Sequence, residues 1–221
     1  MKQMWTDLDH YIETHLIPED PILTQTLKHT DDRGYPDHLA VAPNQGMLLQ
    51  MLIQMNGCKR ILELGTFAAY STMWLARALP EDGYILTIEG RDAHAAVAQE
   101  NIDQAKLKQT IDLRVGRAAD ILKSLPADTA PFDFIFIDAD KQSYPEYLEL
   151  SLNLSRSGTL ILLDNVIRAG DIINPDNHKP SIEGIREMFK LMQEHPRLLS
   201  STALQTVGSK GHDGFALAIV K

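Results

Sequence analysis

The chain has 221 residues, of which 44% are hydrophobic and 23% are charged, a globular balance in a length sufficient for one well-buried α/β domain. Its formal net charge of −9 argues against non-specific binding to nucleic acid or to an anionic membrane. The single cysteine, Cys58, excludes a disulfide within the chain. Together with the absence of a signal-peptide pattern and of a bilayer-length apolar run, it leads us to expect a cytoplasmic protein without a membrane segment.

The first 56 residues have helical spacing. Two short helices are expected between residues 5 and 30, separated by Pro18 and Pro21, since proline interrupts a helix. After a polar loop at 31–43, a third helix is expected over 44–56. Its apolar face, which we expect to pack in the core, consists of Met47, Leu48, Met51, Leu52 and Met55. We expect these helices to cover one side of a binding cleft within a single domain spanning residues 1–221.

From residue 59 onward, strands and helices alternate. Strands are predicted at 60–64, 84–88, 110–115, 132–137 and 159–163, and helices at 71–79, 93–105, 118–125, 144–154 and 182–194. Two last strands, 198–206 and 215–220, have no helix between them and are expected to be antiparallel neighbours. The pattern predicts an α/β, Rossmann-like fold with a seven-stranded, mostly parallel sheet, its last strand antiparallel, and helices on both faces.

The turn after the first strand favours S-adenosylmethionine over a dinucleotide. Gly65 permits a sharp turn, but Phe67 and Tyr70 stand where a dinucleotide-binding sequence has its second and third glycines. Glu63 would repel a phosphate and suits either a methionyl ammonium group or hydrogen-bonded backbone. Glu89 ends the second strand, where its carboxylate can accept both hydroxyls of a ribose. An NAD-dependent oxidoreductase is the alternative from another enzyme class.

Oxygen-bearing side chains follow two other predicted strands. Asp138 comes directly after the strand at 132–137, and Asp164 and Asn165 follow the strand at 159–163. If these strands are parallel neighbours, the three side chains meet at one edge of the sheet and suit a hard divalent cation such as Mg²⁺. Lys141 lies three residues past Asp138, close enough to serve the same site.

Three motifs together resemble one known family. Glu-Leu-Gly-Thr-x-x-x-Tyr-Ser at 63–71, Phe-Ile-Asp-Ala-Asp-Lys at 136–141 and Asp-Asn at 164–165 are similar to those of the cation-dependent O-methyltransferases, which include catechol and caffeoyl-CoA O-methyltransferases and small bacterial relatives. The resemblance runs from about Val41 to the Asp-Gly-Phe at 213–215. It implies a class I methyltransferase fold, S-adenosylmethionine and a divalent cation as cofactors, and a homodimer in which residues 1–56 contribute to substrate binding and to oligomer formation.

The resemblance also implies roles for matching residues. Asp138, Asp164 and Asn165 would bind the metal, and Lys141 would be the general base, acting beside Asp138. The contacts to S-adenosylmethionine would come from Val41, Glu63, Gly65, Thr66, Ser71, Glu89, Ala118 and Asp140. This chain has Ala69 where the family usually has glycine, and a methyl group there is expected to crowd the turn and weaken cofactor binding.

The expected reaction is methylation of a hydroxyl of a vicinal dihydroxy aromatic of the catechol, caffeoyl or flavonoid type. A metal-bound phenol loses its proton more readily, and alignment with the methyl donor supplies a further share of the rate. Methylation of a hydroxylated uridine in transfer RNA and a non-catalytic nucleotide-binding module remain alternatives. We expect residues 166–180 to form a lid or substrate wall with Arg168 as the substrate contact, Tyr144 and Tyr147 to pack in the interior, and His212 to lie in a solvated turn.

Overall fold

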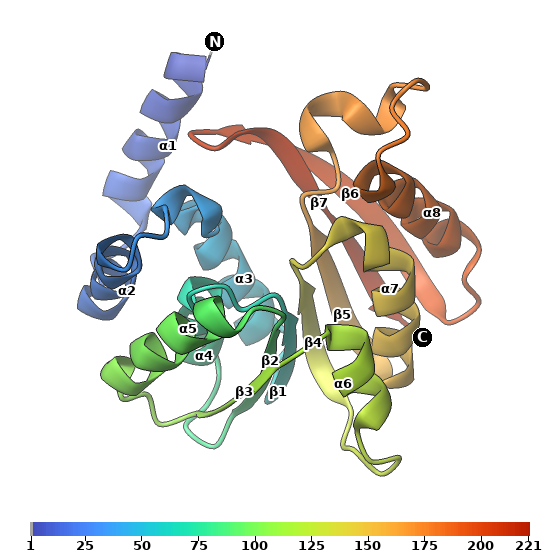
Figure 1. The fold of residues 1–221 in the computed structure, drawn as a ribbon, viewed down its shortest axis with the longest axis horizontal. Helices are drawn as coiled ribbons and strands as arrows, with labels where there is room; N and C mark the ends of the chain where they lie inside the picture. Colours follow the sequence, from blue (N-terminus) through green and yellow to red (C-terminus); the bar gives the residue numbers. More distant parts are fainter. Residues whose placement is uncertain (1) are drawn as a thin grey trace.

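Seven strands form one sheet at the centre of the computed structural model, which describes residues 2–221 (Figure 1). The strands are β1 (Arg60–Leu64), β2 (Tyr84–Glu89), β3 (Thr110–Val115), β4 (Phe132–Ile137), β5 (Ser155–Asp164), β6 (Leu198–Gly208) and β7 (Gly211–Val220). Their spatial order is β3-β2-β1-β4-β5-β7-β6. Strands β1 to β5 pair in parallel, whereas β7 is antiparallel to both β5 and β6. The predicted α/β fold is confirmed.

The register of the central strands brings their carboxyl ends level. Leu64 of β1 pairs with Ile137 of β4, which pairs in turn with Leu163 of β5. The residues that follow each strand therefore leave the sheet at the same edge. This edge lies beside the switch in strand order between β1 and β4, the position at which open α/β sheets bind their ligands.

Helices cover both faces of the sheet, and alternate strand residues supply the two cores. The helices are α1 (Lys2–Leu16), α2 (Pro21–Asp32), α3 (Pro43–Met55), α4 (Tyr70–Ala78), α5 (Asp92–Ala105), α6 (Ala118–Ser124), α7 (Tyr144–Asn153) and α8 (Pro180–Glu194). Ile135 and Ile137 pack with α6, α7 and α8, while Phe134 and Phe136 pack with α2, α3, α4 and α5. Because successive side chains of a strand point to opposite faces, the continuous apolar run of β4 serves both cores.

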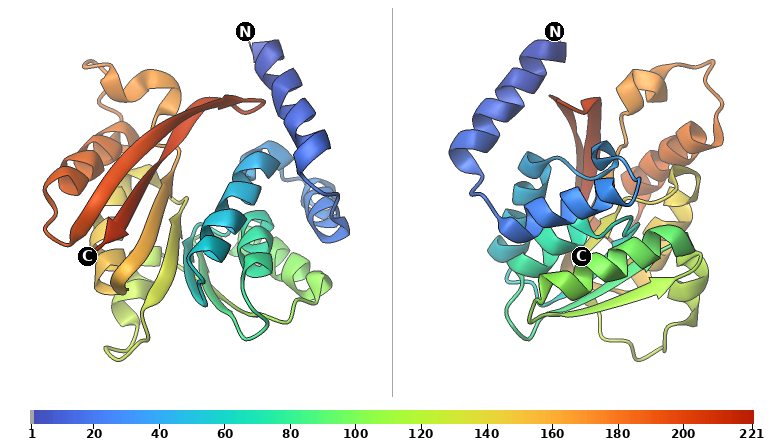
Figure 2. Two further views of the ribbon diagram at one scale, coloured as in Figure 1. Left: turned by 180° about the vertical axis from the view of Figure 1, so that it is seen from behind. Right: turned by 60° about the vertical axis from the view of Figure 1, so that its left-hand side comes forward.

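The N-terminal helices cover the sheet only in part. Helix α3 buries Leu49 and Ile53, but Met51 and Met55 are 49% and 79% exposed, so the prediction that its methionine face packs in the core is wrong for these two. Helix α1 has no buried residue. Figures 1 and 2 show the β6–β7 hairpin reaching across to α1, where the Ser209 amide donates to Asp9 Oδ2 at 2.7 Å.

Several element boundaries differ from those expected. Strands β6 and β7 extend to a two-residue turn at Ser209 and Lys210, so His212 lies in a strand and its Nε2 lies 3.0 Å from Gln205 Oε1. Pro21 opens α2, because the first helical position needs no amide donor. Among the helices of residues 2–221, none combines the length and hydrophobicity needed to cross a bilayer.

Candidate active site

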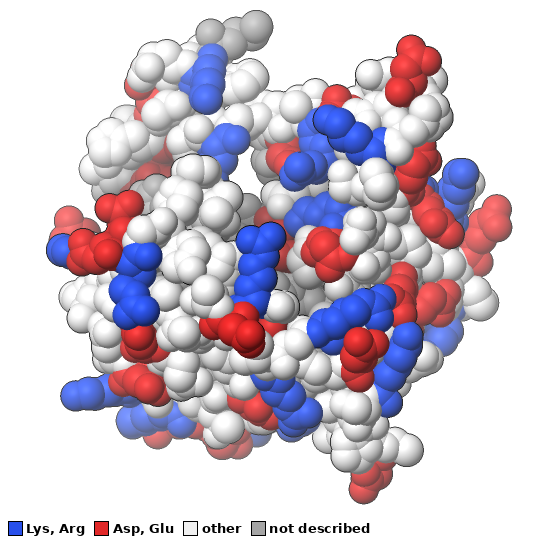
Figure 3. All heavy atoms as spheres, in the orientation of Figure 1, with Lys and Arg blue, Asp and Glu red and all other residues white. Residues whose placement is uncertain are grey.

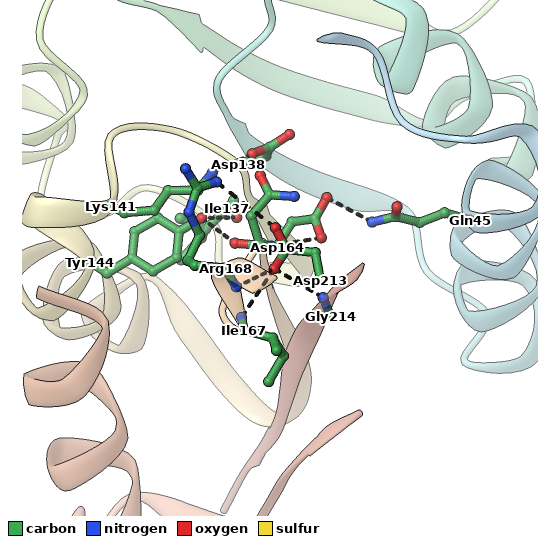
Figure 4. Close-up of polar contacts among 11 residues, drawn as sticks. Gln45, Ile137, Asp138, Lys141, Tyr144, Asp164, Ile167, Arg168, Asp213 and Gly214 are labelled. Atoms are coloured by element: carbon green, nitrogen blue, oxygen red, sulfur yellow. Dashed lines mark hydrogen bonds and ion pairs between the residues drawn. The ribbon is translucent and has the colours of Figure 1, made fainter. Parts of the chain in front are cut away.

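Asp138, Asp164 and Asn165 come together at the carboxyl edge of the sheet. All three line one cavity of about 750 Å³, with Asp138 directly after β4 and Asp164 at the end of β5; Figure 4 shows both at this edge of the sheet. The buried Tyr144 hydroxyl ties these strand ends together, since it donates to the carbonyls of Ile137 and Asp164 at 3.1 and 2.7 Å. The sequence-based expectation that these side chains meet is confirmed.

The polar groups around Asp164 partly compensate for its burial. Asp164 is 5% exposed, and its carboxylate accepts hydrogen bonds from Gln45 Nε2 at 2.7 Å and from the Asn165 amide at 2.8 Å. Burial, and next the negative charge of Asp138, raise the pKa of Asp164. Lys141 Nζ forms an ion pair with Asp138 Oδ1 at 2.6 Å, and its side chain is 11% exposed. The cluster thus holds two carboxylates beside one ammonium group.

The donor set at this edge fits a hard divalent cation. Two carboxylates and a side-chain amide can supply oxygen ligands, the chemistry that Mg²⁺ prefers. A cation between the carboxylates would offset the repulsion from Asp138 that, after burial, raises the pKa of Asp164. Within residues 2–221, no group of three or more His, Cys, Asp or Glu side chains is placed to hold a metal ion. A metal here therefore depends on Asn165 as its third protein ligand.

A second cavity of about 620 Å³ opens beside the first. Of the eight residues expected to contact the methyl donor, seven line it: Val41, Gly65, Thr66, Ser71, Glu89, Ala118 and Asp140. Asp138 and Asn165 line both cavities. A ligand in the second cavity and a ligand in the first would therefore meet beside the oxygen cluster, which consists of Asp138, Asp164 and Asn165.

Gly65 and Glu89 are positioned by the backbone at the ends of β1 and β2. Gly65 adopts φ +97°, and a Cβ there would lie 2.1 Å from the Asp138 carbonyl oxygen, so only glycine fits. The Glu89 carboxylate accepts the amides of Phe67 and Arg91 at 2.8 and 3.0 Å. These bonds fix it on the wall of the second cavity, where the remaining lone pairs of its oxygens can accept hydroxyls.

Glu63 is the one residue expected to contact the methyl donor that does not line the second cavity. Its side chain is fully buried and lines neither cavity. It accepts hydrogen bonds from the hydroxyls of Ser71, Thr72 and Thr87 at 2.6, 2.5 and 2.6 Å. Burial raises its pKa to about 7, although the three hydroxyl donors lower it. Glu63 thus joins β1 and β2 to the first turn of α4, beneath the glycine turn.

Ala69 occupies a left-handed position without facing the second cavity. It precedes α4 at φ 66°, a conformation that glycine adopts more easily. Its side chain is fully buried and belongs to the core cluster on the α2–α5 face. The methyl group therefore lies in the core, and the expected crowding at the cofactor is not what the geometry shows.

Arg168 is the residue of the 166–180 segment that lines the first cavity. Asp213 fixes its backbone: Asp213 Oδ1 accepts the amides of Ile167 and Arg168 at 3.0 and 2.9 Å, and the Arg168 guanidinium lies 3.8 Å from the same carboxylate (Figure 4). Farther along, Arg186 of α8 donates to the carbonyls of Ile172 and Asn177, both at 2.9 Å. The segment is therefore tied to the body of the protein and contributes one wall residue.

Three features of the site have no local pattern in the sequence that would have predicted them. Gln45 contacts Asp164 across 119 positions of the chain, and such a distant pair leaves no local pattern. Tyr35, Phe67 and His94, from three separate segments, pack edge to face with ring centroids 5.0 to 6.0 Å apart. The Tyr147 hydroxyl donates to Asp140 at 2.5 Å, so this buried tyrosine packs as expected and also orients an expected cofactor residue.

Comparison with known proteins places the chain in a family. The O-methyltransferase family profile matches residues 13–218. The chain is 48% identical over 220 residues to a catechol O-methyltransferase of Niastella koreensis, covering 99% of both chains. It is 39% identical to a catechol O-methyltransferase of Mycobacterium tuberculosis, covering 97% of this chain and 96% of the other. The crystal structure of an O-methyltransferase from Bacillus cereus in complex with SAH matches with a TM-score of 0.95 at 46% identity, covering 100% of both chains. The protein therefore belongs to the O-methyltransferase family of enzymes.

Proposed function

We propose that the protein is an S-adenosylmethionine- and divalent-metal-dependent O-methyltransferase that methylates one hydroxyl of a vicinal dihydroxy aromatic. The observation that carries this proposal is the meeting of two cavities at Asp138 and Asn165. The second cavity is lined by residues expected to contact the methyl donor, and the first is lined by the oxygen cluster. A methyl donor and a hydroxyl acceptor bound in them would face each other, as displacement at a methyl group requires.

The second cavity is proposed to bind S-adenosylmethionine. SAH, bound in the Bacillus cereus relative, is what remains of S-adenosylmethionine after methyl transfer. Glu89 would accept the ribose hydroxyls, and the other six lining residues named above would contact the remainder of the ligand. Glu63 would act indirectly, by holding Ser71 and the start of α4 in place. An NAD-dependent oxidoreductase is disfavoured by family membership and by the single glycine of the turn.

Asp138, Asp164 and Asn165 are proposed to hold a divalent cation, most simply Mg²⁺. Bound there, the cation would supply charge that stabilises a phenolate and open positions for two adjacent hydroxyls. Lys141 Nζ, held at the same edge by its ion pair with Asp138, would take the proton of the attacking hydroxyl when in its neutral form. Arg168 would contact the acceptor from the cavity wall.

The acceptor is proposed to be a small aromatic, as the names of the two catechol O-methyltransferase relatives indicate. Methylation of transfer RNA is the weaker candidate. The net charge is −9, and on the face drawn in Figure 3 the lysines and arginines are interspersed with acidic residues, whereas RNA binding needs a continuous basic surface.

We also propose a cytoplasmic homodimer. The exposed apolar side chains of α1 that do not line the first cavity, namely Met4, Leu8 and Tyr11, support an interface that includes this helix. The location is proposed on the single cysteine of the chain, Cys58, which leaves no disulfide within it. Sedimentation of the purified protein would give a monomer mass if the dimer proposal is wrong.

The proposed function is tested by methyl transfer from labelled S-adenosylmethionine to catechol, with and without Mg²⁺. We expect transfer that stops in excess EDTA and returns when Mg²⁺ is restored. Asp138→Ala should lower kcat by at least about 100-fold, because it removes a proposed metal ligand and the partner of Lys141. Full activity in EDTA would reject the metal. Parallel assays with a caffeoyl ester and with hydroxyuridine-bearing RNA would separate the acceptor classes.

A further inference from the structure

The first cavity, in which the acceptor is proposed to bind, extends well beyond the oxygen cluster. Gln45, at the start of α3, contacts Asp164, and Met51 lines the same cavity six residues later. Six residues correspond to about 9 Å along a helix axis. The volume of about 750 Å³ is several times the roughly 150 Å³ that accommodates a benzene molecule. A lone catechol ring at the oxygen cluster would therefore leave most of the cavity unfilled.

Most side chains of this extension are apolar, and Asp9 and Asn44 lie among them. The apolar ones come from α1, the segment after it, and α3: Ile12, Leu16, Ile17, Met47, Leu48 and Met51. Leu16 and Met51 are 70% and 49% exposed. A ligand that covered these side chains would gain from the removal of apolar surface from water, and methionine adapts to ligands of varied shape.

The charges on the cavity wall disfavour an anionic ligand tail. Among the described residues that line it, the carboxylates are Asp9, Asp138, Asp164 and Asp213, and the permanent cations are Arg168 and Lys210. The Arg168 guanidinium faces Asp213, and Lys210 Nζ donates to the carbonyls of His38 and Ala40. With a divalent cation on Asp138 and Asp164, the carboxylates left on this wall are Asp9 and Asp213. Both cations are engaged with the protein, so among the described lining residues no unengaged cation faces an anionic tail.

We propose that the acceptor is an uncharged catechol with an apolar substituent that lies along α1 and α3. This inference rests on the proposed function and narrows its substrate class. The catechol oxygens would occupy the oxygen cluster, and the substituent would cover Met51 and the neighbouring apolar wall. Acceptors with a phosphate- or carboxylate-bearing tail, such as coenzyme A thioesters, would be disfavoured, because Arg168 and Lys210 are engaged with the protein and Asp9 lies on the same wall.

The first experiment compares kcat/KM for catechol, 4-hexylcatechol and 6-(3,4-dihydroxyphenyl)hexanoate. One buried methylene contributes roughly a fourfold gain in affinity, so we expect 4-hexylcatechol to exceed catechol by at least about tenfold. The hexanoate, with a tail of similar length and a negative charge, should lose most of this gain. Equal values for all three would overturn the inference and leave the proposed function intact, whereas no transfer to any of them would overturn the proposed function itself.

A matched pair of variants locates the tail. Met51→Asp changes an exposed residue of α3 that lines the cavity, and Met55→Asp changes an exposed residue of the same helix outside it. We expect Met51→Asp to lower the 4-hexylcatechol to catechol ratio of kcat/KM at least fivefold, by roughly the gain from one or two methylenes, and Met55→Asp to leave it unchanged. Calorimetry should show that Met51→Asp binds 4-hexylcatechol more weakly than Met55→Asp does. Equal ratios in the two variants would show that the tail does not lie along α3.

Discussion

The side-chain amide of Gln45 donates to Asp164 Oδ2 at 2.7 Å and so joins helix α3 to the carboxyl end of β5. This bond connects the apolar acceptor wall to the oxygen cluster, because the same helix carries Met47 and Met51. It also supplies a donor to a carboxylate that is 5% exposed. A buried carboxylate without such donors is poorly oriented for a ligand role.

Gln45→Ala should weaken the proposed metal site without removing a ligand. Groups that orient metal ligands typically contribute 10- to 100-fold in metal affinity, so we expect the Mg²⁺ concentration for half-maximal activity to rise about tenfold. The measurement is a Mg²⁺ titration of methyl transfer. Gln54→Ala, at an exposed position of the same helix, is the control and should leave the titration unchanged. An unaltered Mg²⁺ requirement in Gln45→Ala would show that Asp164 needs no orienting donor.

Lys141→Ala should lower kcat toward catechol by at least about 100-fold, the usual contribution of a general base. The deficit should shrink with 4-nitrocatechol, because its more acidic hydroxyl ionises without a base. Lys123→Ala, in an exposed ion pair on α6, is the control. An equal loss with both acceptors would mean that Lys141 acts through its ion pair with Asp138 and not by proton transfer.

Gly65→Ala should destabilise the protein by at least about 3 kcal/mol, because φ of +97° disfavours any side chain and the new Cβ would lie 2.1 Å from the Asp138 carbonyl oxygen. Urea unfolding measures the loss. Ala69→Gly is the contrasting variant. The substitution relieves about 1 kcal/mol of left-handed strain at Ala69 and loses roughly 0.8 kcal/mol from burial of the Ala69 methyl group, so the two effects nearly cancel.

For Ala69→Gly we therefore expect a stability within about 1 kcal/mol of the wild type. The affinity for SAH, measured by calorimetry, should change less than about threefold, because the methyl group lies in the core and not on the cavity wall. A tenfold gain in affinity would restore the expectation that Ala69 crowds the cofactor.

Glu63 should make stability depend on pH. Its pKa is about 7 in the folded protein against 4.5 as the ordinary value, so the folded state holds the proton more tightly than the unfolded chain. The resulting stabilisation is complete below about pH 4.5 and is lost as the pH rises through 7, by up to about 3 kcal/mol. Glu63→Gln removes this titration.

The measurement compares the urea unfolding of wild type and Glu63→Gln at pH 4.5 and pH 8. The wild type should lose more stability than the variant between the two pH values. Asp164 and all other titrating groups are common to both proteins, so the difference isolates Glu63. Parallel pH profiles would show that the three hydroxyl donors hold the pKa of Glu63 near its ordinary value.

Local patterns predicted most of the fold. The apolar run at 132–137 ends in Asp138 in the structure as in the sequence, and the absence of a helix between β6 and β7 correctly indicated an antiparallel pair. The predictions were least accurate at the N-terminus and at the last turn. The exposed Met51 and Met55 share the helical spacing of core residues, and spacing alone does not say whether a sheet, a ligand or a second chain covers a helix face.

The chemical groups at the carboxyl edge of the sheet follow from the order of the amino acids. Once β4 and β5 pair in parallel, the residues at their carboxyl ends, Asp138 and Asp164-Asn165, lie at the same edge of the sheet. The direction and register of the two strands set this position. The surroundings of these groups arise from long-range packing. Gln45 of a distant helix donates to Asp164, Glu63 lies beneath the glycine turn, and α1 and α3 give the cavity a largely apolar wall. These contacts join segments whose separation along the chain carries no local signal, and packing of the helices against the sheet alone sets them.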